Sequence, residues 1–146
     1  MKVCLDANIL ISYLLKVSSE SPLAKTIQAC FRSDVTLVLP SQVLVEIRRS
    51  AEGKDYLRER ISTTALNEFL EAFEAVAIVP EPLAPAIPSC TRDRFDDYLI
   101  AHVIAEGVDL LISGDRDLLS LGSVLDVHIV SPTSFVAILE AIDRRS

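Results

Sequence analysis

Short apolar runs alternate with segments of helical periodicity along the chain, and this alternation limits the fold more than any other feature. The runs predict strands at residues 2–5, 35–39, 77–79, 110–113 and 127–130. Uninterrupted apolar strands are typical of a parallel sheet that is buried on both faces. The pattern therefore predicts an α/β fold, with one domain over residues 1–146 and a central, mostly parallel sheet of about five strands flanked by helices.

Helices are expected between these strands, and several boundaries carry local signals. The periodic segments cover residues 8–15, 21–32, 63–75 and 96–106, one helix from Ser41 and one from Ser131. Ser21 followed by Pro22 is a typical helix start, and Ser41 is expected to cap the helix that begins there. Gly107 is expected to end the helix over residues 96–106. The proline-rich segment 80–92 is expected to be a loop, and residues 114–117 a tight turn.

Composition excludes several classes of protein. Half of the 146 residues are apolar and the mean hydropathy is +0.37, so the chain can bury a core and is unlike a disordered segment. No apolar run reaches the length of a membrane span, and the N-terminus lacks the pattern of a signal peptide. Three cysteines (Cys4, Cys30 and Cys90) form neither a disulfide framework nor a CxxC metal site. A cytoplasmic protein with reduced thiols is expected.

The net charge argues against one simple mode of nucleic-acid binding. Twenty-one acidic residues against fourteen Lys and Arg give a net charge of −7. Proteins that hold nucleic acid by neutralising phosphates alone are basic. If this chain binds nucleic acid, a bound cation or a local Arg patch has to supply the attraction.

Four acidic residues fall where the expected elements meet the same edge of the sheet. Asp6 follows the first strand, Glu46 lies in the helix after the second, Asp97 opens a later helix, and Asp115 follows the strand that ends near Ser113. In an open parallel sheet, ligands bind beyond the carboxyl ends of the strands. Taken singly, each acid also suits a helix cap, a solvated helix face or a turn.

Taken together, the four acids predict a cation site. Two carboxylates about 4 Å apart repel by roughly 4 kcal/mol at an effective dielectric constant near 20. A cation between them removes this repulsion. A set of carboxylate oxygens without His or Cys is typical of Mg²⁺ or Mn²⁺.

These residues and their flanks resemble the PIN domain family. The resemblance rests on Asp6-x-Asn8 after a first strand, Glu46 after a second, the segment from Asp97 to Ala101, and the segment from Leu111 to Leu118. It extends to the closing segment from Ile129 to Phe135 and so covers nearly the whole chain. The order and spacing of the motifs carry the resemblance, because no single motif is specific.

The resemblance implies a set of site residues. The family's acidic quartet falls on Asp6, Glu46, Asp97 and Asp115, as both metal ligands and catalytic residues. The family's small polar residue two places before the last acid falls on Ser113. The expected supporting residues are Asn8, Asp93, Ser113 and Asp117.

Two details depart from the family pattern. Arg94 stands where one branch of the family commonly has Pro, so the register of the neighbouring acids is open. The spacing of the final acids varies in the family, so the residues leave open whether Asp115 or Asp117 is the fourth acid.

The family resemblance also implies a function. PIN proteins include metal-dependent ribonucleases, among them VapC-type toxins of toxin–antitoxin pairs. It implies an endoribonuclease that uses Mg²⁺ or Mn²⁺, an RNA substrate, a protein antitoxin as a possible partner, and a homodimer. The alternative is a catalytically inactive PIN-like module that binds RNA or protein.

Other α/β enzymes with acidic or nucleophilic sites fit less well. A phospho-acceptor receiver needs a Lys after its last strands, and the lysines here stop at Lys54. Dehalogenase-type phosphatases need Asp-x-Asp, whereas residue 8 is Asn. Triad hydrolases lack their Gly-x-Ser-x-Gly motif here, and His102 and His128 are interpreted as ordinary helix and strand residues.

Overall fold

A five-stranded sheet forms the centre of the computed structural model, which describes residues 1–15, 20–83 and 94–145. The strand order is β2-β1-β3-β5-β4, and every pairing is parallel except that of β4 with β5. The strands are β1 (Lys2–Leu5), β2 (Thr36–Val38), β3 (Leu110–Ile112), β4 (Ser123–Val124) and β5 (Val127–Val130). The predicted α/β class with a mostly parallel sheet is confirmed.

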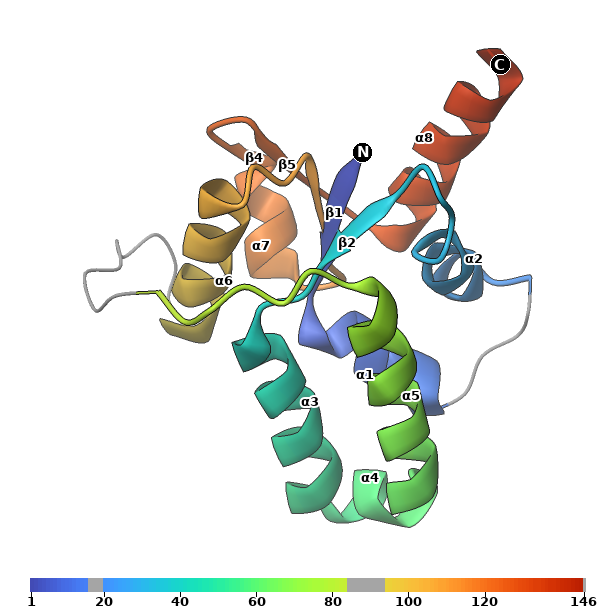
Figure 1. Cartoon of the computed structure of the whole chain (residues 1–146), viewed down its shortest axis with the longest axis vertical. Coiled ribbons are helices and arrows are strands. Elements are labelled where there is room, and N and C mark those ends of the chain that lie inside the picture. Colours follow the sequence, from blue (N-terminus) through green and yellow to red (C-terminus); the bar gives the residue numbers. More distant parts are fainter. Residues whose placement is uncertain (16–19, 84–93, 146) are drawn as a thin grey trace.

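Eight helices are described, and they cover both faces of the sheet. They are α1 (Ala7–Leu15), α2 (Pro22–Ala29), α3 (Ser41–Gly53), α4 (Asp55–Arg60), α5 (Thr63–Val76), α6 (Arg94–Ala105), α7 (Arg116–Leu121) and α8 (Pro132–Arg145). In Figure 1, α6 and α7 lie on one side of the strands, and α2 and α8 lie on the other. Helices α3, α4 and α5 extend beyond the end of the sheet at which β1 and β2 finish. None of the described helices is long and apolar enough to cross a membrane.

Apolar side chains from all layers form one core. Phe73 of α5 and Phe135 of α8 are its largest fully buried side chains. The apolar face of α1, which includes Leu10, is buried in the same core. The apolar residues of α1 are therefore used within this chain.

A chain of aromatic contacts fixes α5 against the early helices. Phe69 stacks on Tyr13 of α1 with ring centroids 5.5 Å apart, and it meets Phe73 edge-on at 4.7 Å. Phe73 in turn lies 5.2 Å from the ring of Phe31, just after α2. Aromatic pairs in this distance range add stability beyond their buried area. These contacts set the position of α5 beside α3.

The fifth strand is not the one that the sequence predicts. Residues 77–79 make only an isolated bridge, in which Ile78 pairs with Val38 at the edge of β2. The fifth strand is β4, which pairs with β5 across a tight connection in which Leu125 has a positive φ of 52°. A two-residue strand is defined by its partner rather than by its own apolar pattern, so the sequence gives little sign of it.

Helix boundaries follow the predicted signals with three corrections. The side chain of Ser21 caps α2 as expected, but α2 ends at Ala29, earlier than the predicted Arg32. Ser41 does not cap α3; it is the first helical residue and follows Pro40. The predicted turn at 114–117 is the start of α7, capped by Asp115. Gly107 has a positive φ of 64° just after α6, as its predicted capping role requires.

Two of the three cysteines are buried thiols. Cys4 lies in β1 and Cys30 directly follows α2, and neither forms a disulfide. Burial raises the pKa of the Cys30 thiol to about 12, and it raises the pKa of Cys4 even further. Both therefore stay protonated and unreactive at neutral pH. Cys90 lies outside the described residues.

Candidate functional site

The parallel register places one row of residues along the carboxyl edge of the sheet. Cys4 pairs with Val38 on one side, and Leu5 pairs with Ile112 on the other. Continued past the ends of the strands, this register makes Asp6, two residues after Cys4, level with Pro40. It also makes Asp6, one residue after Leu5, level with Ser113. Asp6 is the acidic member of this row.

Asp6 is held at the junction of β1 and α1. Its amide donates a hydrogen bond to the carbonyl of Ile112 at 3.0 Å, and its own carbonyl accepts one from the Ile9 amide at 3.1 Å. The residue is only 3% exposed. A carboxylate in this position is fixed by the backbone on both sides and has little contact with solvent.

Ser113 joins Asp6 to the loop that carries Asp115. The Ser113 hydroxyl donates to Oδ2 of Asp6 at 2.9 Å and accepts from the backbone amide of Asp115 at 3.0 Å. Ser113 itself is fully buried. This hydroxyl therefore connects two predicted site residues that are 109 positions apart in the sequence.

Burial raises the pKa of Asp6 above its ordinary value of 3.8. Desolvation is the main cause, because water stabilises the charged form of a carboxyl group. The nearby charge of Asp115 raises the pKa further, whereas the hydrogen bond from Ser113 and the amides of Ala7 and Asn8 lower it. An ionised Asp6 beside Asp115 is a position where a cation would be stabilised.

Asp115 and Asp117 occupy different environments although they are two residues apart. Oδ1 of Asp115 caps α7 by accepting from the amides of Asp117 at 2.7 Å and Leu118 at 3.4 Å. Asp115 is half-buried, while Asp117 is exposed in the first turn of α7. Of the two, Asp115 is the one whose charge acts on Asp6.

Helix α6 brings two further acids to the same edge. Asp96 and Asp97 lie in its first turn, and both are buried. The helix precedes β3 and runs back along the sheet, so its first turn lies at the end where the parallel strands finish (Figure 1). The topology thus places the first turn of α6, with Asp96 and Asp97, at the carboxyl edge of the sheet.

Glu46 and Asn8 occupy more exposed positions than Asp6. Glu46 is half-buried on α3, and its carboxylate accepts a hydrogen bond from the Ser50 hydroxyl at 3.4 Å. Asn8 is exposed in the first turn of α1. Asp93 lies outside the described residues.

The described side chains do not form a finished metal site. In residues 1–15, 20–83 and 94–145, no group of three or more His, Cys, Asp or Glu side chains is close enough to hold an ion. The donor chemistry nevertheless fits Mg²⁺ or Mn²⁺, because the acids at this edge offer hard carboxylate oxygens and Asp6 is buried. Among these acids, Asp115 is the one whose charge is seen to act on Asp6.

Replacing Ser113 by Ala is expected to raise the pKa of Asp6 further and to destabilise the fold by about 1–2 kcal/mol. The substitution removes a hydrogen bond to the Asp6 carboxylate and leaves the amide of Asp115 without its acceptor. NMR titration of the carboxyl carbons and denaturant unfolding measure the two effects. Ser120→Ala, which removes an exposed hydroxyl bonded to the Asp117 carbonyl, is the control. An unchanged pKa of Asp6 would contradict the role assigned to Ser113.

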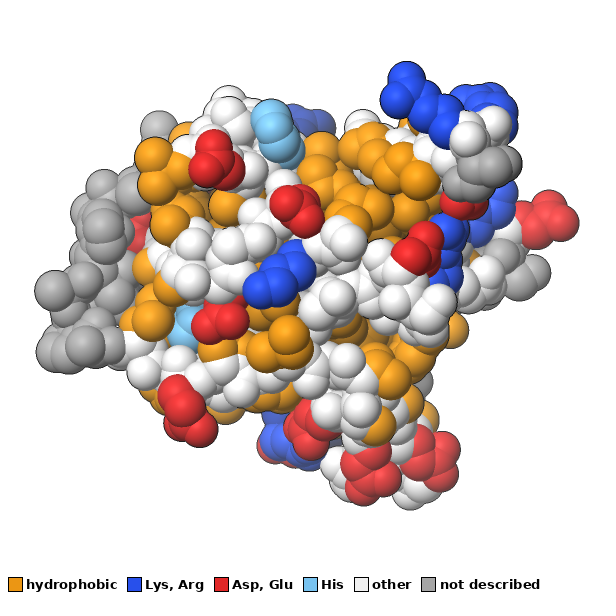
Figure 2. Space-filling model, turned by 45° about the horizontal axis from the view of Figure 1, so that its top comes forward, with side chains coloured by type: hydrophobic (Ala, Val, Ile, Leu, Met, Phe, Trp, Pro, Cys, Tyr) orange, Lys and Arg blue, Asp and Glu red, His pale blue; other side chains and the backbone are white. Residues whose placement is uncertain are grey.

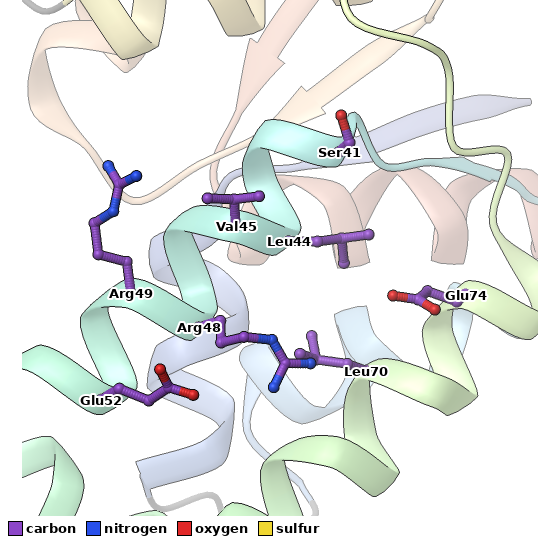
Figure 3. A pocket seen from close by; sticks show the side chains of 8 residues that line it. All are labelled: Ser41, Leu44, Val45, Arg48, Arg49, Glu52, Leu70 and Glu74. Carbon is purple, nitrogen blue, oxygen red and sulfur yellow. The ribbon is translucent and has the colours of Figure 1, made fainter.

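A groove of about 530 Å³ opens between α3 and α5, beginning where α3 leaves the sheet. Figure 3 shows the Arg48 side chain reaching across it towards Leu70, and the Glu74 carboxylate pointing towards Leu44 and Ser41. Its lining residues are Ser41, Leu44, Val45, Arg48, Arg49, Glu52, Leu70 and Glu74. The sequence does not predict this groove.

His102 is buried in α6 away from the acidic row. Its ring lies 5.0 Å from that of Tyr98, and neither nitrogen has a hydrogen-bond partner in the described part of the chain. Burial lowers the pKa of His102 below 6.5, so its ring is neutral at pH 7. His128 lies in β5, in agreement with its predicted strand position.

The fold and the acidic edge together define an α/β domain whose candidate site lies beyond the carboxyl ends of parallel strands. Residues 2–117 match the PIN domain family, which is well over half of the chain. The chain belongs to the PIN domain family.

Structural comparison agrees with this assignment. The chain is similar to one in the crystal structure of VapBC2 from Rickettsia felis bound to a DNA fragment from their promoter. The match has a TM-score of 0.61 and 14% sequence identity, and it covers 90% of this chain and 98% of the other. At this identity the likeness shows the fold alone. No curated protein matches the chain.

Proposed function

We propose that this chain is a metal-dependent endoribonuclease that hydrolyses RNA phosphodiester bonds with Mg²⁺ or Mn²⁺, and that it is the toxin of a toxin–antitoxin pair in the cytoplasm. The observation that carries the proposal is the buried Asp6 carboxylate, linked through Ser113 to the loop of Asp115. Its raised pKa marks a carboxylate whose charged form lacks sufficient stabilisation from the protein alone.

Four acids would hold the metal: Asp6, Glu46, Asp97 and Asp115. A bound divalent ion would supply an activated water and charge stabilisation at the scissile phosphate. Asp6 and Asp115 would form the centre of the site, with Asp97 reaching it from α6 and Glu46 from α3. Membership of the PIN family supports this choice of residues.

The protein's own contribution is to fix and orient these donors. Ser113 directs Oδ2 of Asp6 and also holds the backbone at Asp115. Asn8 and Asp117, at the first turns of α1 and α7, would orient the acids or water beside them. Asp93, four residues before Asp97 in the sequence, is proposed as a further supporting residue of the site.

Partners follow from the same proposal. A protein antitoxin would block access to the acidic edge, and a homodimer is the proposed assembly. The fold shared with a chain of the VapBC2 structure supports an antitoxin as the first partner to test.

The proposal is tested by incubating the purified chain with end-labelled single-stranded RNA in Mg²⁺, in Mn²⁺ and in EDTA. Cleavage that requires a divalent metal is expected, because the acids at this edge repel RNA phosphates until a cation is bound. RNA binding that is the same with and without metal, in the absence of cleavage, would instead support the inactive binding module. Cleavage that persists in EDTA would contradict the metal-dependent mechanism.

A further inference from the structure

We propose that the groove between α3 and α5 holds a nucleotide of single-stranded RNA next to the cleavage site. Arg48 and Arg49 bind its phosphates, and Glu74 contacts its base. The inference rests on the proposed function and extends it, because it assigns a substrate-binding surface outside the acidic edge.

The groove begins beside the proposed cleavage site. The register of β1 and β2, continued past their ends, makes Asp6 level with Pro40, and Ser41 at the end of the groove is the next residue. An α-helix rises 1.5 Å per residue, so Arg48 and Arg49 stand about 10–12 Å further along α3. An RNA strand cleaved at the sheet edge can therefore extend along this groove.

Apolar side chains form the floor on which a base can lie. Leu44 and Val45 come from α3 and Leu70 comes from α5, and Val45 is 52% exposed. The volume of about 530 Å³ is within the usual range of small-ligand pockets. Unpaired bases of RNA are commonly bound through their flat apolar faces while their edges make hydrogen bonds.

Two arginines of α3 are among the residues that line the groove. Nη1 of Arg48 donates to Oδ1 of Asn67 on α5 at 2.9 Å, which fixes the guanidinium across the groove. A guanidinium has five donors, so this bond leaves it able to bind a phosphate as well. Arg49 is three residues after Glu46 and so lies on the adjoining flank of α3, between the groove and a proposed metal ligand. Figure 3 shows its side chain extending from the opposite side of α3 to Arg48.

Glu74 in the groove can accept hydrogen bonds from a base, whereas a bare anion would be repelled by its carboxylate. Figure 3 shows the Glu74 carboxylate facing Ser41 and Leu44 at the end of the groove nearest the sheet. A carboxylate accepts hydrogen bonds from the amino groups of cytosine and adenine, whereas uracil presents a carbonyl oxygen at the corresponding position. Glu74 therefore predicts a preference for an amino-bearing base over uracil.

RNA binding by this chain requires basic residues at the binding site itself, because the surface as a whole does not attract RNA. The net charge of the chain is −7. On the face shown in Figure 2, basic side chains gather at the C-terminal end of α8, where Arg144 and Arg145 lie, and are otherwise scattered among acids. Arg48 and Arg49 supply the positive charge of the groove, which Glu52 and Glu74 also line.

The test is fluorescence anisotropy of a labelled 12-nucleotide RNA in EDTA, so that binding is measured without cleavage. Arg48→Gln/Arg49→Gln is expected to raise Kd at least tenfold and to reduce the slope of log Kd against log salt by about 1.4, from two lost phosphate contacts. Arg58→Gln/Arg60→Gln removes the same charge from exposed positions on α4 and is expected to change Kd less than twofold. Equal losses in both pairs, or no loss in either, overturn the proposal.

The base preference gives a second, independent measurement. Wild-type protein is expected to bind oligo(C) more tightly than oligo(U), and Glu74→Gln is expected to reduce that ratio at least threefold. An unchanged ratio overturns the role of Glu74. Both binding measurements are made without metal. A chain that binds RNA in this way but never cleaves it would therefore refute the proposed nuclease activity and support the proposed role of the groove. Metal-dependent cleavage together with unaltered RNA binding in the Arg48→Gln/Arg49→Gln variant would support the nuclease activity and refute the proposed role of the groove.

Discussion

Asp6→Asn is expected to abolish RNA cleavage and at the same time to make the metal-free protein more stable. In the folded chain, burial and the charge of Asp115 raise the pKa of Asp6. At pH 7 its ionised form therefore opposes folding, and the neutral amide removes this penalty. Asn still suits the position before a helix. We expect a gain of the order of 1 kcal/mol, equivalent to about 3 °C in Tm for a domain of this size.

The stability gained by Asp6→Asn is expected to depend on pH. Because the folded-state pKa of Asp6 lies above the unfolded value of 3.8, the folded state binds the proton more tightly. The penalty is complete above the folded pKa and disappears as the pH falls towards 3.8. The stability gain of Asp6→Asn should therefore be largest at neutral pH and should shrink in acid. Denaturant unfolding at pH 7 and pH 4.5 measures it.

Activity and metal binding complete the test of Asp6. Loss of a direct ligand is expected to lower cleavage by at least about 100-fold, since even outer-shell partners of metal ligands contribute 10–100-fold. Mg²⁺ should raise the Tm of the wild-type protein but have little effect on the variant, because a ligand stabilises only the state that binds it. Asp126→Asn, an exposed acid between β4 and β5, is the charge-matched control. A variant that is less stable at pH 7 yet fully active would refute both parts.

Asp115→Asn and Asp117→Asn are expected to differ sharply, and together they identify the fourth acid. Asp115 is half-buried and its charge acts on Asp6, whereas Asp117 is exposed. Asn caps a helix about as well as Asp, so Asp115→Asn should keep α7 intact while removing a metal ligand. We expect cleavage to fall about 100-fold or more in Asp115→Asn and to stay within threefold of wild type in Asp117→Asn.

The same pair has a readout that does not depend on activity. The charge of Asp115 contributes to the raised pKa of Asp6, so Asp115→Asn should lower that pKa in NMR titration, and Asp117→Asn should leave it nearly unchanged. Circular dichroism confirms that both variants are folded. Equal losses of activity in the two variants would show that both carboxylates take part. A larger loss in Asp117→Asn would move the fourth position to that residue.

The sequence by itself determined the fold class, the family and most elements of the domain. Apolar runs such as 2–5 and 110–113 predict buried parallel strands, because a strand covered on both faces needs apolar residues at every position. Capping by Ser21 and the positive φ of Gly107 were also predictable, because both depend on chemistry within a few residues. The position of Asp6 directly after the first strand was predictable for the same reason, because it depends only on where the neighbouring apolar run ends.

Tertiary structure decided the features that depend on partners distant in the chain. Residues 77–79 have the composition of a strand but find only one bridge beside β2, while the two residues of β4 join the sheet because β5 lies next to them. The position of α5, which forms one side of the groove, depends on ring contacts with Tyr13 of α1 and with Phe31 just after α2. Most of all, the burial of Asp6 and its link through Ser113 to Asp115 join segments more than 100 residues apart. Desolvation and hydrogen bonding across such a distance depend on packing, and a local sequence pattern cannot encode them.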